Sequence, residues 1–158
     1  MDYAKNANPP TWRTFLDQHV RDLVSIDFFI VLTATFRVLF VFILLVHDRR
    51  RIVHFNVTEH PTAQWTAQQI VEAFPFNTAP SYLIRDGDGI YGERVTRRIE
   101  SLGIDEVITA PVSPWQNAYV ERMIGTLRRE LFDHVIVLNE RHLNRLMSSY
   151  LDYYHPWR

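Results

Sequence analysis

The stretch 110–130, APVSPWQNAYVERMIGTLRRE, predicts the helix around which the rest of the chain is organised. Ser113 is a favourable N-cap, Pro114 suits the first helical position, and Gln116 completes a Ser-x-x-Gln capping box. Apolar residues then recur at helical spacing and form a stripe that faces the core: Val120, Met123, Ile124, Leu127 and Leu131.

A neighbouring face of this helix carries Asn117, Glu121 and Arg128, with Gly125 leaving the surface between them bare. One carboxylate is therefore displayed about two turns from a guanidinium. A solvated Glu/Arg pair is the plainer interpretation of this face on its own. The acids found elsewhere in the chain decide between that interpretation and a site.

The composition predicts one globular domain. The chain has 158 residues, of which 47% are hydrophobic and 13% aromatic, and its net charge is −1. We expect a flexible tail over residues 1–10 and a core over 11–158. Cysteine is absent, which excludes disulfides, thiolate zinc sites and thiol nucleophiles and agrees with a cytoplasmic location. Among 17 cationic residues only Lys5 is a lysine. Arginine binds phosphate oxygens in pairs and favours a polyanionic partner, although a GC-rich coding bias explains the excess equally well.

Residues 28–46, FFIVLTATFRVLFVFILLV, form an apolar run that resembles a membrane span followed by Arg49, Arg50 and Arg51. Arg37 would then lie in mid-membrane, at a cost of roughly 2.5–3.5 kcal/mol. The run is rich in β-branched and aromatic residues, and Thr33-Ala34-Thr35 breaks it near the middle. We therefore predict two buried antiparallel strands and no membrane association.

The remaining patterns predict an α/β fold with a mixed sheet. A short helix over 11–24 precedes three strands, which the patterns place at 25–33, 36–46 and 51–58. Helices and strands then alternate: a helix from 63 to 74, a strand at 82–84, a helix at 94–102 that Gly103 ends, a strand at 104–109, the helix that starts at Ser113, and a final helix at 141–154.

Three acids stand out because their surroundings are unfavourable for a carboxylate. Asp27 interrupts the apolar strand VSIDFF, Asp86 follows a buried strand, and Glu121 lies on the helix described above. Taken singly, each is more often structural. Together, three oxygen ligands without cysteine suit Mg²⁺ or Mn²⁺ rather than zinc, and such a cluster can hold two ions around a phosphodiester.

Asp27 in IDFF, Asp86 in RDGDGIY and Glu121 in SPWQNAYVER are separated by 58 and 34 residues. This pattern resembles the Asp-Asp-Glu triad of bacterial insertion-sequence transposases and of retroviral-type integrases. The resemblance spans residues 11–155, and the block SPWQNAYVERMIGTLRRE is its most specific part.

The resemblance implies a ribonuclease H-like fold with a mixed five-stranded sheet flanked by helices, and a nucleotidyltransferase and endonuclease that acts in DNA integration, recombination and transposition. It implies that the triad holds two Mg²⁺ or Mn²⁺ ions, that the partners are transposon-end and target DNA, and that the core is a homodimer or larger assembly. It also implies a set of DNA-binding residues: Asn117, Arg122, Arg128 and Arg129.

The middle motif departs from the commonest form of the family, Asp-Asn-Gly before an aromatic residue. Counting back from Tyr91 selects Asp86 as the ligand, with Asp88 as the alternate. No DNA-binding module accompanies the core, so we expect a fragment. Two further functions stay open: a nuclease that only hydrolyses, and a non-catalytic remnant that folds, dimerises and at most binds DNA. Trp115 and Tyr119 are candidates for stacking on an unpaired base, or are core or dimer contacts.

Overall fold

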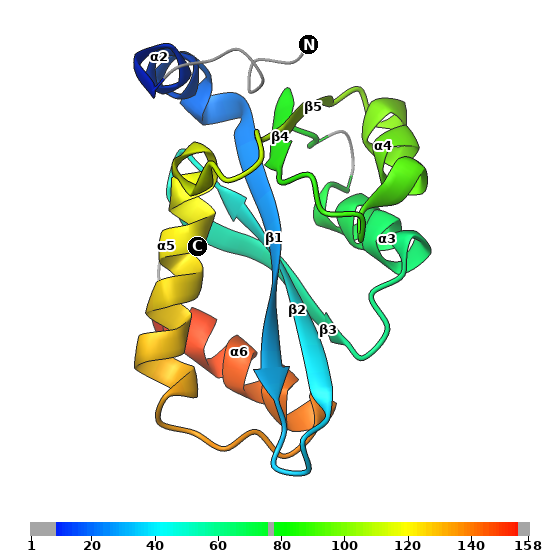
Figure 1. Cartoon of the computed structure of the whole chain (residues 1–158), viewed down its shortest axis with the longest axis vertical. Helices are drawn as coiled ribbons and strands as arrows, with labels where there is room; N and C mark the ends of the chain where they lie inside the picture. Colours follow the sequence, from blue (N-terminus) through cyan, green and yellow to red (C-terminus); the bar gives the residue numbers. More distant parts are fainter. Residues whose placement is uncertain (1–8, 76–77, 155–158) are drawn as a thin grey trace.

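The computed structural model describes residues 9–75 and 78–154, and a five-stranded sheet in the order β3-β2-β1-β4-β5 forms its centre (Figure 1). Strands β1 (Leu23–Leu32), β2 (Val38–Val46) and β3 (Arg51–Thr58) form an antiparallel meander. Strands β4 (Tyr82–Arg85) and β5 (Asp105–Ile108) extend the sheet in parallel with β1. The predicted mixed sheet of three strands and then two is confirmed.

The apolar run forms the predicted hairpin. β1 and β2 pair without interruption from Val24 opposite Val46 to Leu32 opposite Val38. Arg37 lies at the turn between them, where its side chain is 72% exposed and forms an ion pair with Glu59 at 3.2 Å. Among residues 9–75 and 78–154, no helix has the length and apolar character that crossing a membrane requires.

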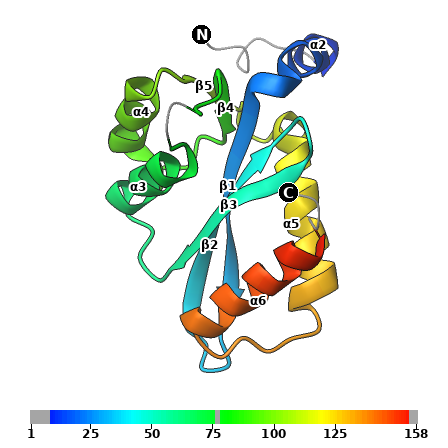
Figure 2. The ribbon, with the colours of Figure 1, turned by 180° about the vertical axis from the view of Figure 1, so that it is seen from behind.

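Helices cover both faces of the sheet, which explains why β1 and β2 read as continuous apolar segments. Helices α3 (Ala63–Ala73) and α4 (Gly92–Ser101) lie on one face, and α5 (Ala118–Leu127) and α6 (Glu140–Tyr154) on the other (Figure 1). Figure 2, the view from behind, shows α6 in front of the β1–β2 hairpin, and α6 also contacts β3. Each pair of helices closes its own hydrophobic cluster against the sheet.

The first helix differs from its predicted bounds. Helix α2 spans Pro9–His19, a single 3₁₀ turn, η1, follows at Val20–Asp22, and β1 already starts at Leu23. The prediction of helix up to residue 24 was wrong because Leu23 and Val24 pair with β4 and β2, and this tertiary pairing overrides their place in the amphipathic pattern. Residues 1–8 of the predicted tail lie outside the described residues.

Helix α2 adds a third, smaller cluster. Trp12 and Phe15 are buried against Leu23 of β1, Ile84 of β4 and Val107 of β5. This packing ties the N-terminal helix to the same strands that carry the candidate site.

The predicted capping box before α5 is absent. The hydroxyl of Ser113 donates to the carbonyl of Pro111 at 3.3 Å, and the Gln116 side chain accepts from the Ala110 N–H at 2.6 Å. A 3₁₀ turn, η2 (Pro114–Asn117), therefore precedes the helix. The buried Gln116 side chain bonds backward to the loop after β5, where it satisfies the Ala110 N–H instead of capping the helix.

The apolar stripe of α5 is confirmed, since Val120, Met123, Ile124 and Leu127 are buried and Leu131 packs partly buried beside them. A π-helical turn, η3 (Arg128–Phe132), continues the helix. Helix α4 starts at Gly92, two residues before its predicted start. Gly103 ends it as predicted, with a φ of 76° that suits glycine.

Candidate active site

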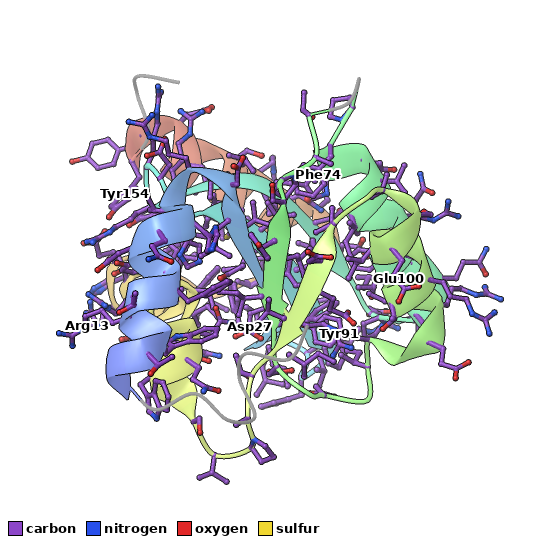
Figure 3. The ribbon with its side chains drawn as sticks, turned by 90° about the horizontal axis from the view of Figure 1, so that it is seen from above. Arg13, Asp27, Phe74, Tyr91, Glu100 and Tyr154 are labelled. Carbon is purple, nitrogen blue, oxygen red and sulfur yellow. The ribbon has the colours of Figure 1, made fainter. Side chains whose placement is uncertain are left out.

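The pairing of β1 with β4 brings the first two acids together. These parallel strands align Leu23 with Tyr82 and Ser25 with Ile84. The same register, continued by two residues, sets Asp86 beside Asp27. Figure 3 shows Asp27 in the middle of the molecule, with Tyr91 toward the α4 side.

Helix α5 supplies the third acid. Its buried stripe packs on the β1 face that contains Phe29, so that Glu121 on the adjoining side of the helix faces the same region. Asp27, Asp86 and Glu121 all line one cavity of about 420 Å³, together with Asp88, Tyr91 and Arg128. The structure thus gathers the three predicted acids from two strands and a helix.

The electrostatics of the cavity are those of crowded carboxylates. The pKa of Asp27 is raised from 3.8 to about 8, mainly by burial. The nearby charges of Asp86 and Glu121 contribute to this rise, while the Phe28 N–H, which donates to Asp27 Oδ1 at 2.8 Å, opposes it. A side-chain interaction with Glu121 also contributes to the raised pKa of Asp27. Burial, followed by the charges of Asp27 and Asp86, also raises the pKa of Tyr91.

The turn after β4 distinguishes Asp86 from Asp88. Asp86 Oδ1 accepts from the Asp88 N–H at 3.0 Å, and Asp88 Oδ1 accepts from the Ile90 N–H at 3.0 Å. Both side chains line the cavity, but Asp86 is the one whose charge acts on Asp27. The choice of Asp86 as a ligand, with Asp88 as the alternate, stays a prediction.

Arg85 supports this turn, and its part was not anticipated from the sequence. Its buried guanidinium donates to Glu106 Oε2 at 2.6 Å and to the Asp86 carbonyl at 2.7 Å. Thr96 also donates to Glu106, at 3.0 Å, and the Arg85 Cζ lies 4.9 Å from the centroid of the Tyr91 ring. The sequence offered one signal for this ion pair, namely an arginine at the end of one apolar strand and an acid in the next strand.

The four predicted DNA-binding residues occupy different places. Arg128 lines the carboxylate cavity, with its Cζ 5.6 Å from the Phe29 ring centroid. Asn117 is buried in a neighbouring cavity that shares Asp86, Asp88 and Glu121, and its Oδ1 has no hydrogen-bond partner among the described residues.

The other two predicted DNA-binding residues lie away from the carboxylates. Arg129 is exposed and folds back along the helix, with an Nη2 to Thr126 Oγ1 distance of 3.5 Å. Arg122 stacks on Tyr119, where its Cζ is 5.2 Å from the ring centroid. The structure therefore brings Arg128 and Asn117, and not Arg122 or Arg129, to the acids.

The donor set suits a hard divalent cation. It consists of carboxylates, with an amide oxygen nearby that lacks a donor, and no nitrogen or sulfur ligand is among the cavity residues. In the part of the chain that the structure describes, no three acidic or histidine side chains already stand in a metal-binding arrangement. The acids share a cavity without a formed coordination shell, so their role as ligands stays a prediction.

Comparison with known proteins finds similarity to one family over part of the sequence and to solved structures over most of the fold. The sequence model of the integrase core domain family matches residues 102–158, a segment that holds Glu121 and Arg128 but neither Asp27 nor Asp86. No curated protein matches the chain.

Solved integrases share the fold. One is the simian T-cell lymphotropic virus intasome in complex with the PP2A regulatory subunit B56 gamma, with a TM-score of 0.67 and 15% identity over 82% of this chain. Another is the catalytic core domain of BIV integrase, with a TM-score of 0.56 and 18% identity, where 82% of each chain is covered. A third is the HTLV-2 integrase catalytic core domain with magnesium, with a TM-score of 0.59 and 12% identity over 82% of this chain and 85% of that core. The match covers 48% of the intasome chain, so this chain spans about half of that protein's length.

The resemblance to integrase and transposase catalytic cores is thereby confirmed, by sequence over residues 102–158 and by fold over most of the chain. The five-stranded mixed sheet flanked by helices is the ribonuclease H-like fold of these cores. The assignment to the bacterial insertion-sequence type stays a prediction.

Proposed function

We propose that the chain is the catalytic core of a metal-dependent polynucleotidyl transferase that cuts a transposon end and joins its 3′ hydroxyl to target DNA. The observation that carries the proposal is the shared cavity of Asp27, Asp86 and Glu121, with Arg128 on its wall. The match of residues 102–158 to the integrase core domain family supports the reaction class. We also expect association as a homodimer, as in the HTLV-2 core that is described in a dimeric form.

Asp27, Asp86 and Glu121 would hold the cations, with Asp88 as the alternate to Asp86. Two Mg²⁺ or Mn²⁺ ions bound there supply Lewis-acid activation of the attacking hydroxyl and of the phosphorus centre. The divalent charge suits the pocket because the carboxylates lie together, and proximity to Asp86 and Glu121 contributes to the raised pKa of Asp27.

The chain's own groups position the reactants. The Phe28 N–H holds one Asp27 oxygen, and Arg85 anchors the carbonyl of Asp86, so both acids are oriented before substrate arrives. Arg128 is the cation that lines the cavity and is placed to bind a phosphate oxygen of the DNA. The proposal assigns no protein side chain as a general base.

A labelled DNA end tests the proposal and separates it from its alternatives. With Mn²⁺, a transferase releases a short labelled product and also joins the end to a second duplex. A nuclease that only hydrolyses gives the first product without the second. If the chain binds DNA but forms neither product at any metal concentration, the non-catalytic remnant is the alternative that remains.

One pair of variants separates chemistry from binding. Glu121→Gln is expected to abolish cleavage while leaving DNA affinity unchanged or slightly higher, because a repelling charge is removed. Arg128→Ala is expected to weaken binding and to lower the salt slope by roughly one unit, because about one fewer counterion is released. Affinities measured at two salt concentrations check both results. Equal binding by the two variants would contradict the assignment of roles.

A further inference from the structure

A second groove lies on the other flank of α5. It has a volume of about 410 Å³ between α2 and the start of α5, and its lining includes Trp12, Arg13, Trp115, Tyr119 and Arg122. At about 100° per helical residue, Tyr119 and Arg122 lie on the side of the buried stripe away from Glu121 and Arg128. The groove is therefore separate from the carboxylate cavity.

Tyr119 lines this groove and is the centre of a cationic cluster, in which Arg122 also lines the groove and Arg50 lies beyond its lining. The Cζ atoms of Arg50 and Arg122 lie 4.5 and 5.2 Å from its ring centroid. Arg50 Nη2 also donates to the Tyr119 hydroxyl at 3.2 Å, and the His47 ring packs edge-on at 4.9 Å between centroids. Burial and the charge of Arg50 lower the pKa of His47 to about 4, so this ring adds no charge near neutral pH.

These two guanidiniums lack a carboxylate partner. The ion pairs between described residues join other side chains, and neither Arg50 nor Arg122 has an acid within 4.0 Å in the described part of the chain. Among the described residues that line the groove, Asp17 is the single acid, and Arg13 and Arg122 are the two arginines. Two cations held on one ring without a counter-charge form a site for an anion.

Trp115 provides the second half of a nucleotide site. It lines the same groove, and the residue is 40% exposed, whereas Trp12 is 2% exposed. The Tyr119 ring is already occupied by cations, so Trp115 is the aromatic face that remains available. An exposed indole beside unpaired guanidiniums matches a base and its phosphate, and a base can stack on a side chain only when it is unpaired.

We propose that this groove binds an unpaired nucleotide of the DNA substrate, with the phosphate on Arg122, the base on Trp115, and Arg50 adding positive charge beside Tyr119. The proposal rests on the proposed function, because an unpaired nucleotide is part of the substrate only if the chain acts on DNA.

Binding of a fluorescein-labelled (dT)₁₂ strand by the full chain, in EDTA so that no cleavage occurs, tests the proposal. Trp115→Ala is expected to weaken binding roughly 5- to 150-fold, and Trp115→Phe to retain most of the affinity. Arg122→Gln is expected to lower the single-strand salt slope by about 0.7, and Arg50→Gln with Arg122→Gln by about 1.4. Arg97→Gln, on the exposed face of α4, is the matched control and should bind like the parent.

A blunt duplex of the same length is the second ligand. We expect Trp115→Ala to change duplex affinity less than threefold, since paired bases cannot reach the indole. Unchanged (dT)₁₂ binding by Trp115→Ala and Arg122→Gln, in variants that melt like the parent, would overturn the proposal, as would equal losses on strand and duplex. If the parent fails to cut DNA while these binding differences hold, the catalytic proposal is wrong, and the proposal that the groove binds an unpaired nucleotide is still supported.

Discussion

Replacement of Asp27 by Asn is expected to abolish strand cleavage. The side chain keeps its size and its hydrogen bond from the Phe28 N–H, but it loses the charge that a cation in the shared cavity needs. Loss of an outer-shell partner typically costs 10- to 100-fold in a metal site, and the loss of a central ligand should exceed about 100-fold. A time course with an end-labelled duplex and Mn²⁺ measures it.

The same variant is expected to flatten the pH dependence of stability in the metal-free protein. The pKa of Asp27 is about 8 in the fold against 3.8 normally, so the folded state binds the extra proton between these values. The stability that this group contributes is present below pH 3.8 and is lost as the pH rises through about 8. Between pH 5 and 9, the Tm of the metal-free parent should therefore fall more steeply with rising pH than the Tm of Asp27→Asn. Retained cleavage, or parallel melting curves, would contradict this account of Asp27.

The second large effect concerns Glu106 and the fold. Its carboxylate pairs with Arg85 at 2.6 Å, and the two side chains are 9% and 7% exposed. Glu106→Ala leaves a buried guanidinium without its counter-charge, which costs about 3–5 kcal/mol. In a chain of this size, Tm should fall by roughly 6–20 °C. Urea and thermal unfolding give the free energy and Tm.

Two further variants interpret that result. Glu93→Ala removes an ion pair with Arg97 in which the side chains are 89% and 79% exposed, so it should change stability by about 0.5 kcal/mol or less. Arg85→Met with Glu106→Leu removes both buried charges and should restore most of the stability. A loss below about 1 kcal/mol for Glu106→Ala would mean that the Arg85 charge is solvated in solution.

Local sequence patterns were sufficient to predict most of the helices and strands. The break at Thr33-Ala34-Thr35 and the cost of placing Arg37 in lipid both favoured a hairpin, and β1 and β2 form it. The buried stripe on α5 was also predictable from the sequence, because the spacing of its apolar residues depends on that helix alone. The motif spacing also selected three acids that share a cavity, although nothing local places Asp86 beside Asp27. That neighbourhood follows from the parallel register of β1 with β4. The family resemblance implied only that the three acids act together.

What could not be predicted depends on contacts distant in sequence. Gln116 leaves its expected cap because the Ala110 N–H competes for it, and Leu23 extends β1 because β4 pairs with it. Arg85 and Glu106 meet only through the register of β4 with β5. The clustering of Arg50 and Arg122 on Tyr119 likewise requires the turn after β2 to reach α5. In each case the sequence shows the type of side chain but does not show which residue that side chain contacts.

The central claim is that Asp27, Asp86 and Glu121 together hold divalent cations. Anomalous diffraction from a crystal of the full chain soaked in Mn²⁺ tests it most directly. We predict manganese peaks in the cavity, with oxygens of all three side chains in contact, after small movements of Asp86 and Glu121. Peaks at Asp88 in place of Asp86 would change one ligand only. Saturating Mn²⁺ with no peak between Asp27 and Glu121 would contradict the account.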